Sequence, residues 1–116
     1  MERIVSGVGV LDKSSALLAA VADGPCTLSE LSERTGTSRA TAHRLAVALE
    51  AHGLLRRKRD GRFALGLHLM SLGRTAAQQF PLAEAAADAL VGLRDTTGES
   101  VQLYVRDGAD RVCVAA

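Results

Sequence analysis

The sequence lacks a disulfide framework and any long apolar run. Its two cysteines, Cys26 and Cys113, lie far apart with no further Cys or His at metal-ligand spacing, so we expect both thiols to be small buried apolar groups. Stretches without a charged residue, such as residues 63–73, fall well short of the ~18 apolar residues that span a bilayer. We therefore expect a soluble protein with no membrane anchor and no metal.

Secretion signals and catalytic motifs are missing as well. Residues Met1–Ile4 do not begin a basic run followed by an apolar stretch and a cleavage site, so the expected location is the cytoplasm. The sequence has no Gly-x-Ser-x-Gly elbow and no pair of carboxylates on one evident face, and the hydroxyls of Thr27 and Ser38 have roles as helix caps. We therefore expect no enzyme and no cofactor.

Length and composition indicate a small globular protein. Apolar residues make up 47% of the 116 positions and charged residues 23%, which excludes a disordered or fibrous chain. This length allows one domain, or one small domain followed by a fragment of another.

Positive charge is concentrated in the middle of the chain. The net charge is +1, but residues 39–62 hold seven basic and two acidic residues, whereas residues 1–38 and 63–116 each carry a charge of −2. A compact positive block in an otherwise acidic chain is expected where a segment meets phosphates. The alternative is a solvated surface, which a charge run alone commonly indicates.

An initial helix is predicted from about Gly9 to Asp23. Apolar residues recur along it at spacings of three and four, and Gly24-Pro25 ends it. The predicted stripe consists of Leu11, Ser14, Leu17, Leu18, Val21 and Ala22. Ser14 is its small polar exception.

Two capped helices joined by a short turn follow. Thr27 and Glu30 have the spacing of a capping box, which opens a second helix of about eight residues that Gly36 closes. Ser38 is placed to cap a third helix over residues 39–52. This arrangement predicts a helix-turn-helix.

The third helix is expected to present two different faces. Its apolar face should pack against the first two helices and consists of Ala42, Leu45, Ala46 and Leu49. The outer face offers Arg, which can fork onto guanine, Thr with a hydroxyl and a methyl, and a small Ala that permits close approach. Recognition helices read bases with their first residues. The residues expected at DNA are therefore Ser38, Arg39, Ala40, Thr41, His43 and Arg44, together with Thr27; the alternative for each is a solvated helix surface.

A basic β-hairpin is predicted directly after the third helix. Asp60-Gly61 lies between two short β-capable runs, and glycine supplies the positive φ of a tight turn. Lys58, Arg59 and Arg62 would then lie against the phosphates or the minor groove while the third helix occupies the major groove. Charges on the two strands would also deter edge-to-edge pairing, which is the structural alternative.

These segments resemble the winged helix-turn-helix of the IclR-type bacterial transcription regulators. The resemblance rests on residues 38–45, 49–54 and 60–66. Within that family the chain is most similar to NdgR-type regulators of leucine and other amino-acid biosynthesis, through residues 7–13, 97–104 and 111–116. The resemblance implies a sequence-specific DNA-binding regulator, a repressor or an activator, that controls genes of amino-acid metabolism.

The remainder of the chain is predicted to form two helices and a hairpin. Residues 66–79 favour a linker helix that ends before Pro81, because proline disfavours a helical residue ahead of it. Another helix is favoured over residues 81–97, with Leu90 and Leu93 on its apolar side and Gly98 at its end. Strands are expected at residues 100–106 and 111–114, with a turn at 107–110.

The expected fold class is mainly α with a small β-hairpin wing, a linker helix and a truncated α/β segment. We expect a winged helix-turn-helix domain at residues 1–66, a linker helix at 67–80 and the start of an effector-binding domain at 81–116. Two strands and one helix cannot bury a core alone, so we expect a truncated chain. The resemblance implies a small-molecule effector only in a full-length form, and we assign no residue to it.

The resemblance also implies a symmetric dimer. The first and linker helices of two chains would pack together and place two recognition helices about one turn of DNA, ~34 Å, apart over a palindromic operator. The expected partners are therefore double-stranded DNA and a second copy of the chain. An alternative is a winged-helix module that binds proteins, whose basic hairpin docks an acidic partner.

Overall fold

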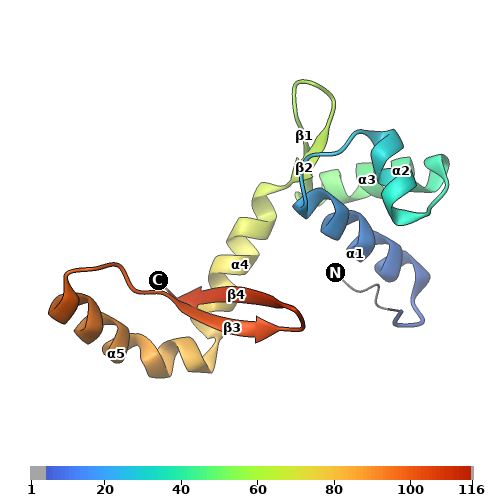
Figure 1. Ribbon diagram of the computed structural model, residues 1–116. Helices are drawn as coiled ribbons and strands as arrows, with labels where there is room; N and C mark the ends of the chain where they lie inside the picture. The colour runs from blue at the N-terminus through green and yellow to red at the C-terminus, as the bar shows by residue number, and fades with distance from the viewer. Residues whose placement is uncertain (1–4, 116) are drawn as a thin grey trace. The chain divides into compact units, whose positions relative to one another are not determined.

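The computed structural model describes residues 5–115, in two units that divide after Met70 and are treated separately. The expectation about secretion rested on residues 1–4, which lie outside the described part. The elements are α1 (Gly9–Ala22), α2 (Leu28–Thr35), α3 (Arg39–Ala51), β1 (Leu55–Arg57), β2 (Phe63–Leu65), α4 (Leu67–Gln79), α5 (Pro81–Thr97), β3 (Leu103–Asp107) and β4 (Asp110–Ala115) (Figure 1). The predicted fold class, mostly helical with a small antiparallel hairpin, is confirmed.

The helix caps of the first unit form as the sequence predicts. The Thr27 hydroxyl accepts a hydrogen bond from the Glu30 N–H at 3.2 Å, and the Glu30 carboxylate accepts one from the Thr27 N–H at 3.1 Å. Gly36 ends α2 in the left-handed conformation at φ 68°. The Ser38 hydroxyl then accepts a bond from the Thr41 N–H at 3.2 Å, so the cap of α3 lies two residues after Gly36 and the helix begins at Arg39.

The core of this unit lies between the three helices and the base of the hairpin. Its buried apolar residues are Leu17, Val21, Cys26, Leu31, Ala42, Leu45, Ala46, Leu49, Leu55 and Phe63. The predicted apolar face of α3 is therefore confirmed. The predicted stripe of α1 is wrong in part, because Leu11 is 60% exposed and Ala22 is exposed too. Burial on α1 begins only at Leu17, since the neighbouring elements do not cover its first turns.

Strands β1 and β2 form the predicted antiparallel hairpin. Arg57 pairs with Phe63 in register, and Gly61 at φ 86° makes the turn that closes on a bond from the Lys58 N–H to the Arg62 carbonyl at 2.8 Å. Cys26, ahead of α2, exchanges two backbone hydrogen bonds with Phe63, at 3.0 and 2.7 Å. The base of the hairpin is thereby fixed to the helix-turn-helix.

Two glycines join the end of α3 to the start of α4. Gly53, at φ 72°, accepts a bond from the His68 N–H at 3.0 Å, and the Gly66 N–H donates to Leu54 at 2.9 Å. The backbones approach so closely that a Cβ on Gly66 would lie 2.1 Å from the Gly53 carbonyl oxygen. Both positions therefore require glycine, one for its conformation and the other for the space.

The second unit contains the rest of α4, then α5 and the hairpin of β3 and β4. Helix α5 ends at Gly98 in the left-handed conformation, as predicted. Strand β3 begins at Leu103 and not at residue 100, and Leu103 pairs with Ala115, the last residue of β4 that the structure describes. Cys113 is exposed on a sheet of two strands, so the prediction of a buried thiol is wrong there.

Candidate nucleic-acid interface

The candidate recognition surface is the side of α3 opposite its buried stripe. The exposed residues on it include Ser38, Arg39, Ala40, His43 and Arg44, while Thr41 is half-buried. Val47, 42% exposed, continues this face one turn further, and the sequence analysis did not include it among the site residues. The two faces of α3 thus divide as the sequence predicts.

Hydrogen bonds between Ser38 and Thr41 stabilise the first turn of α3. The Ser38 hydroxyl accepts from the Thr41 N–H and donates to the Thr41 hydroxyl oxygen at 2.9 Å. The free amides of a helix start favour an anion, and the fixed hydroxyls narrow the conformations available to the side chains there. This end of α3 is suited to a phosphate or the polar edge of a base.

The cations on α3 have no partner in the part of the chain that the structure describes. Among residues 5–115, the side chains of Arg39, His43 and Arg44 make no ion pair or hydrogen bond. An Arg without an internal acceptor keeps its five donors for an external one, and its planar fork matches the O6 and N7 atoms of guanine. This part of α3 is therefore able to bind acceptors in a groove.

The hairpin cations differ from one another. Arg59 is exposed and has no ion pair within the described range 5–115. Lys58 lies 3.9 Å from Asp60, whereas Arg62 lies 3.8 Å from Asp60 and 3.6 Å from Glu30 of α2. The sequence analysis grouped these three cations, but the structure gives internal counter-charges to two of them.

Two further arginines on β1, Arg56 and Arg57, differ in their contacts within the protein. Arg57 lies over the ring of Phe63, 4.6 Å from its centroid, and 3.9 Å from Glu50, so its guanidinium is used inside the protein. Arg56 is exposed and unpaired within the part of the chain that the structure describes. The sequence analysis did not single out Arg56; the alternation of a strand is the signal that distinguishes it from its neighbour.

Thr27 has a defined structural role at the start of α2. Its hydroxyl and backbone N–H are both engaged with Glu30 in the capping box. These bonds, followed by the nearby charges of Arg62 and Arg34, hold the pKa of the Glu30 carboxyl below its usual value of 4.5. Beside the hairpin, α2 therefore carries an ionised carboxylate at neutral pH.

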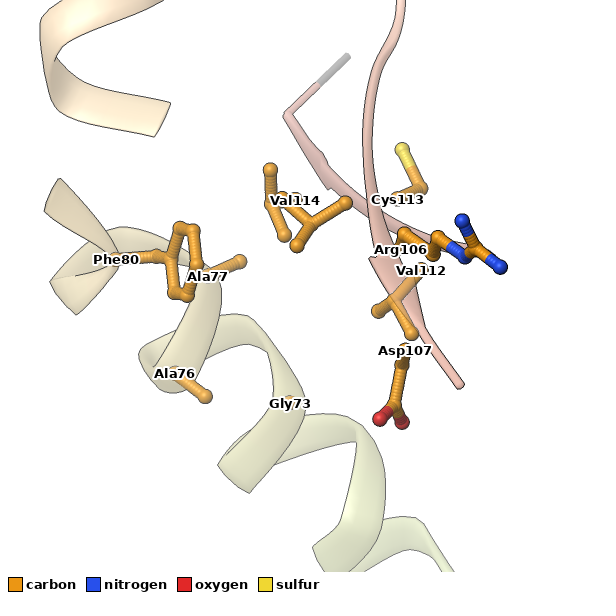
Figure 2. A pocket seen from close by; sticks show the side chains of 10 residues that line it. Gly73, Ala76, Ala77, Phe80, Arg106, Asp107, Val112, Cys113 and Val114 are labelled. Carbon is orange, nitrogen blue, oxygen red and sulfur yellow. The ribbon is translucent and has the colours of Figure 1, made fainter. Parts of the chain in front are cut away.

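The second unit contains an apolar hollow between the end of α4 and the β3–β4 hairpin (Figure 2). Ala77, Phe80 and Val114 face into it, whereas the charged end of Arg106 points away. Among residues 5–115, no cluster of three or more His, Cys, Asp or Glu side chains is suited to a metal ion. None of the helices in that range is long and apolar enough to cross a bilayer.

Comparison with known protein families identifies the helix-turn-helix. Residues 10–59 match the IclR helix-turn-helix domain. A curated relative, the HTH-type transcriptional regulator KipR of Bacillus subtilis, is 35% identical over 88% of this chain and 41% of its own length. The transcriptional repressor IclR of Escherichia coli is 28% identical over 82% of this chain and 35% of its own. The chain thus spans about two fifths of these relatives.

Solved structures of the same kind resemble the fold over nearly the whole chain. The IclR protein of Thermotoga maritima superposes with a TM-score of 0.68 and 30% identity, covering 91% of this chain and 44% of that protein. HmgR of Pseudomonas aeruginosa gives a TM-score of 0.71 and 26% identity, covering 91% of this chain and 47% of that one. The winged helix-turn-helix arrangement described above is therefore also that of these proteins.

Proposed function

Because residues 10–59 form an IclR-type helix-turn-helix domain, we propose that this chain binds double-stranded DNA as part of a transcription regulator. The observation that carries the proposal is the division of α3: one face is core, and the other presents Arg39 and Arg44, which have no partner among residues 5–115. The curated relatives are described as transcriptional regulators, which favours a binding role without a catalytic step or a cofactor.

The recognition helix reads the major groove with its first two turns. Arg39 and Arg44 are the side chains able to fork onto guanine, and His43 lies between them on the same exposed face. Ser38, Ala40 and Thr41 sit at the start of the helix, where the backbone comes closest to the duplex. Thr27 caps the start of α2, which is the first helix of the helix-turn-helix motif.

The hairpin grips the sugar-phosphate backbone. Lys58, Arg59 and Arg62 supply its positive charge, and Arg56 on β1 adds a cation that has no ion pair within residues 5–115. Contacts of this kind fix the position of a protein on DNA and make its affinity depend steeply on salt.

The DNA-binding form is a homodimer on a palindromic operator. Apolar side chains are exposed at the start of α1 and at the start of α4. They include Val8, Val10, Leu11, Leu67 and Met70. Burial of these side chains against a second copy joins the first and linker helices and spaces the two α3 helices by about one turn of DNA, ~34 Å.

Its regulated genes belong to amino-acid metabolism, and its action is repression. The first inference rests on the resemblance to NdgR-type regulators, and the second is supported by two relatives described as repressors, including the acetate operon repressor of Salmonella typhimurium. DNA binding belongs to residues 1–66, linkage to 67–80, and residues 81–116 open a domain that takes a small effector in a longer form. The protein acts in the cytoplasm.

Selection of bound sequences from random DNA by the purified chain tests this function. We expect an enriched motif with two inverted half-sites whose centres lie about ten base pairs apart or at a multiple of that spacing. Enrichment without symmetry would contradict the dimer but keep DNA recognition. No enrichment and no retardation of any duplex at low salt would favour a module that binds an acidic protein.

A further inference from the structure

Arg62 and Arg59 stand in different electrostatic surroundings although both belong to the hairpin. The guanidinium of Arg62 lies 3.6 Å from Glu30 and 3.8 Å from Asp60. Arg59 has no such neighbour within residues 5–115. Of these two hairpin cations, Arg62 therefore has carboxylates of the protein beside it, whereas Arg59 has none among the described residues.

Of the two carboxylates, Glu30 is the one that belongs to a separate element. Asp60 lies in the turn, where it accepts a bond from the Arg62 N–H at 3.0 Å and moves with the hairpin. Glu30 lies in the first turn of α2, where the Thr27 N–H holds one oxygen and Arg34 lies 3.3 Å from the other. Because the capping box fixes it, Glu30 presents a stationary negative charge to Arg62.

The Glu30–Arg62 pair is not what fixes the hairpin to the helices. The backbone bonds between Cys26 and Phe63 do that, and the Phe63 side chain is only 2% exposed in the core. The two partners of the ion pair are 33% and 45% exposed, and such pairs add little to stability. Removal of the Glu30 charge should therefore leave β2 in place and change only the charge that the hairpin offers.

We propose that Glu30 is an internal counter-charge that limits the grip of the hairpin on DNA, by holding Arg62 in competition with a backbone phosphate. The inference rests on the proposed function, since it requires the hairpin to meet DNA. A phosphate can engage Arg62 fully only by displacing Glu30. Arg62 therefore contributes less than one full phosphate contact, whereas Arg59, which has no ion pair among the described residues, contributes one.

Glu30→Gln removes the negative charge beside Arg62 and keeps the capping box of α2. Glutamine serves the same position of a capping box, so α2 keeps its start while Arg62 loses its partner from α2. Glu33→Gln is the matched control, because Glu33 is exposed on the same helix and has no ion pair among the described residues. Arg62→Ala and the double variant Glu30→Gln/Arg62→Ala complete the set.

The measurement is the salt dependence of the full chain's affinity for a fluorescein-labelled duplex of random sequence, followed by fluorescence anisotropy. Each phosphate contact adds about 0.9 to the magnitude of the slope of log K against log salt. We expect Glu30→Gln to steepen the slope by up to one contact and to bind about two to five times more tightly at low salt. Glu33→Gln and the double variant should keep the wild-type slope, and Arg62→Ala should lose much less than one contact.

The outcomes separate this inference from the proposed function. Wild-type binding with an unchanged slope in Glu30→Gln, or the loss of a full contact in Arg62→Ala, would overturn the counter-charge and leave DNA binding intact. Failure of the wild type to bind any duplex would overturn both. Carbon NMR titration of the Glu30 carboxyl gives a readout without DNA: its pKa should rise in Arg62→Ala, and an unchanged pKa would show that the two charges do not interact.

Discussion

Arg44 and Arg59 carry the same charge but are suited to different DNA contacts. Arg44 lies on the outer face of α3, whereas Arg59 lies at the tip of the hairpin. Arg44→Ala should reduce the preference for selected over random DNA by about 1–3 kcal/mol, and Arg59→Ala should weaken binding to both DNAs alike. Competition gel shifts with the two duplexes check this. Equal losses on both DNAs for Arg44→Ala would refute its role as a base reader.

Gly66 is the position in the first unit where a single methyl group should be most damaging. Its Cβ would meet a backbone carbonyl at 2.1 Å, and relief of that contact requires the bond between Gly66 and Leu54 to lengthen or break. We expect Gly66→Ala to lower the free energy of unfolding by about 1–3 kcal/mol. Thermal unfolding followed by circular dichroism measures it. Gly9→Ala is the control, since a Cβ there has open space, and a similar loss in both variants would contradict the steric cause.

Residues whose partners are close in the sequence were the predictable ones. Thr27 and Ser38 bond to amides three positions ahead, so their capping roles could be predicted from spacing alone. Arg62 lies close to Glu30, which belongs to a helix far away in the sequence, and no local sequence pattern indicates that pair. Cys113 was predicted to be buried but is exposed, because an alternating strand pattern does not specify whether another element covers β4. The recognition residues on α3 remain predictions, because their test is DNA itself.

At the scale of the elements, the start of α2 depends on the ionised carboxylate of Glu30. Hydrogen bonds from Thr27, then Arg62 and Arg34, lower the pKa of Glu30 from 4.5. A carboxylate whose pKa is lowered by folding stabilises the protein above its usual pKa, and that contribution disappears as the pH falls through the lowered value. We expect acidification below pH 4.5 to lower the melting temperature of the wild type more than that of Glu30→Gln. Parallel melting curves for the two proteins across this range would contradict the assignment.

The bounds of the helices followed from the sequence better than those of the strands. Glycine and proline mark helix ends locally, and α1, α2 and α5 begin and end within a residue or two of the predicted limits. Strand limits depend on pairing, and β3 begins only where β4 reaches it. The stripe of α1 failed at Leu11 for a related reason: periodicity identifies a face but not the length over which another element covers it.

At the scale of the whole molecule, the exposed side of α1 supports the proposed dimer. Leu11 lies outside the core, so Leu11→Asp should leave the fold intact while it abolishes dimerisation and weakens operator binding. Sedimentation velocity measures the dimer, and circular dichroism verifies the fold. Lys13→Asp, on the opposite side of the helix, is the control. A dimer that survives Leu11→Asp would place the interface elsewhere.

The joint between Gly53 and Gly66 sets a limit on where the proposed DNA-binding unit can be fused to another domain. A splice at Leu65 would discard both Gly66 and the His68 amide that bonds to Gly53, and with them the link between the base of the hairpin and the helix that follows. A fusion should therefore carry the native chain at least through His68. A rotation that the fused domain imposes on α4 would then be transmitted to the end of α3 through the hydrogen bond between His68 and Gly53.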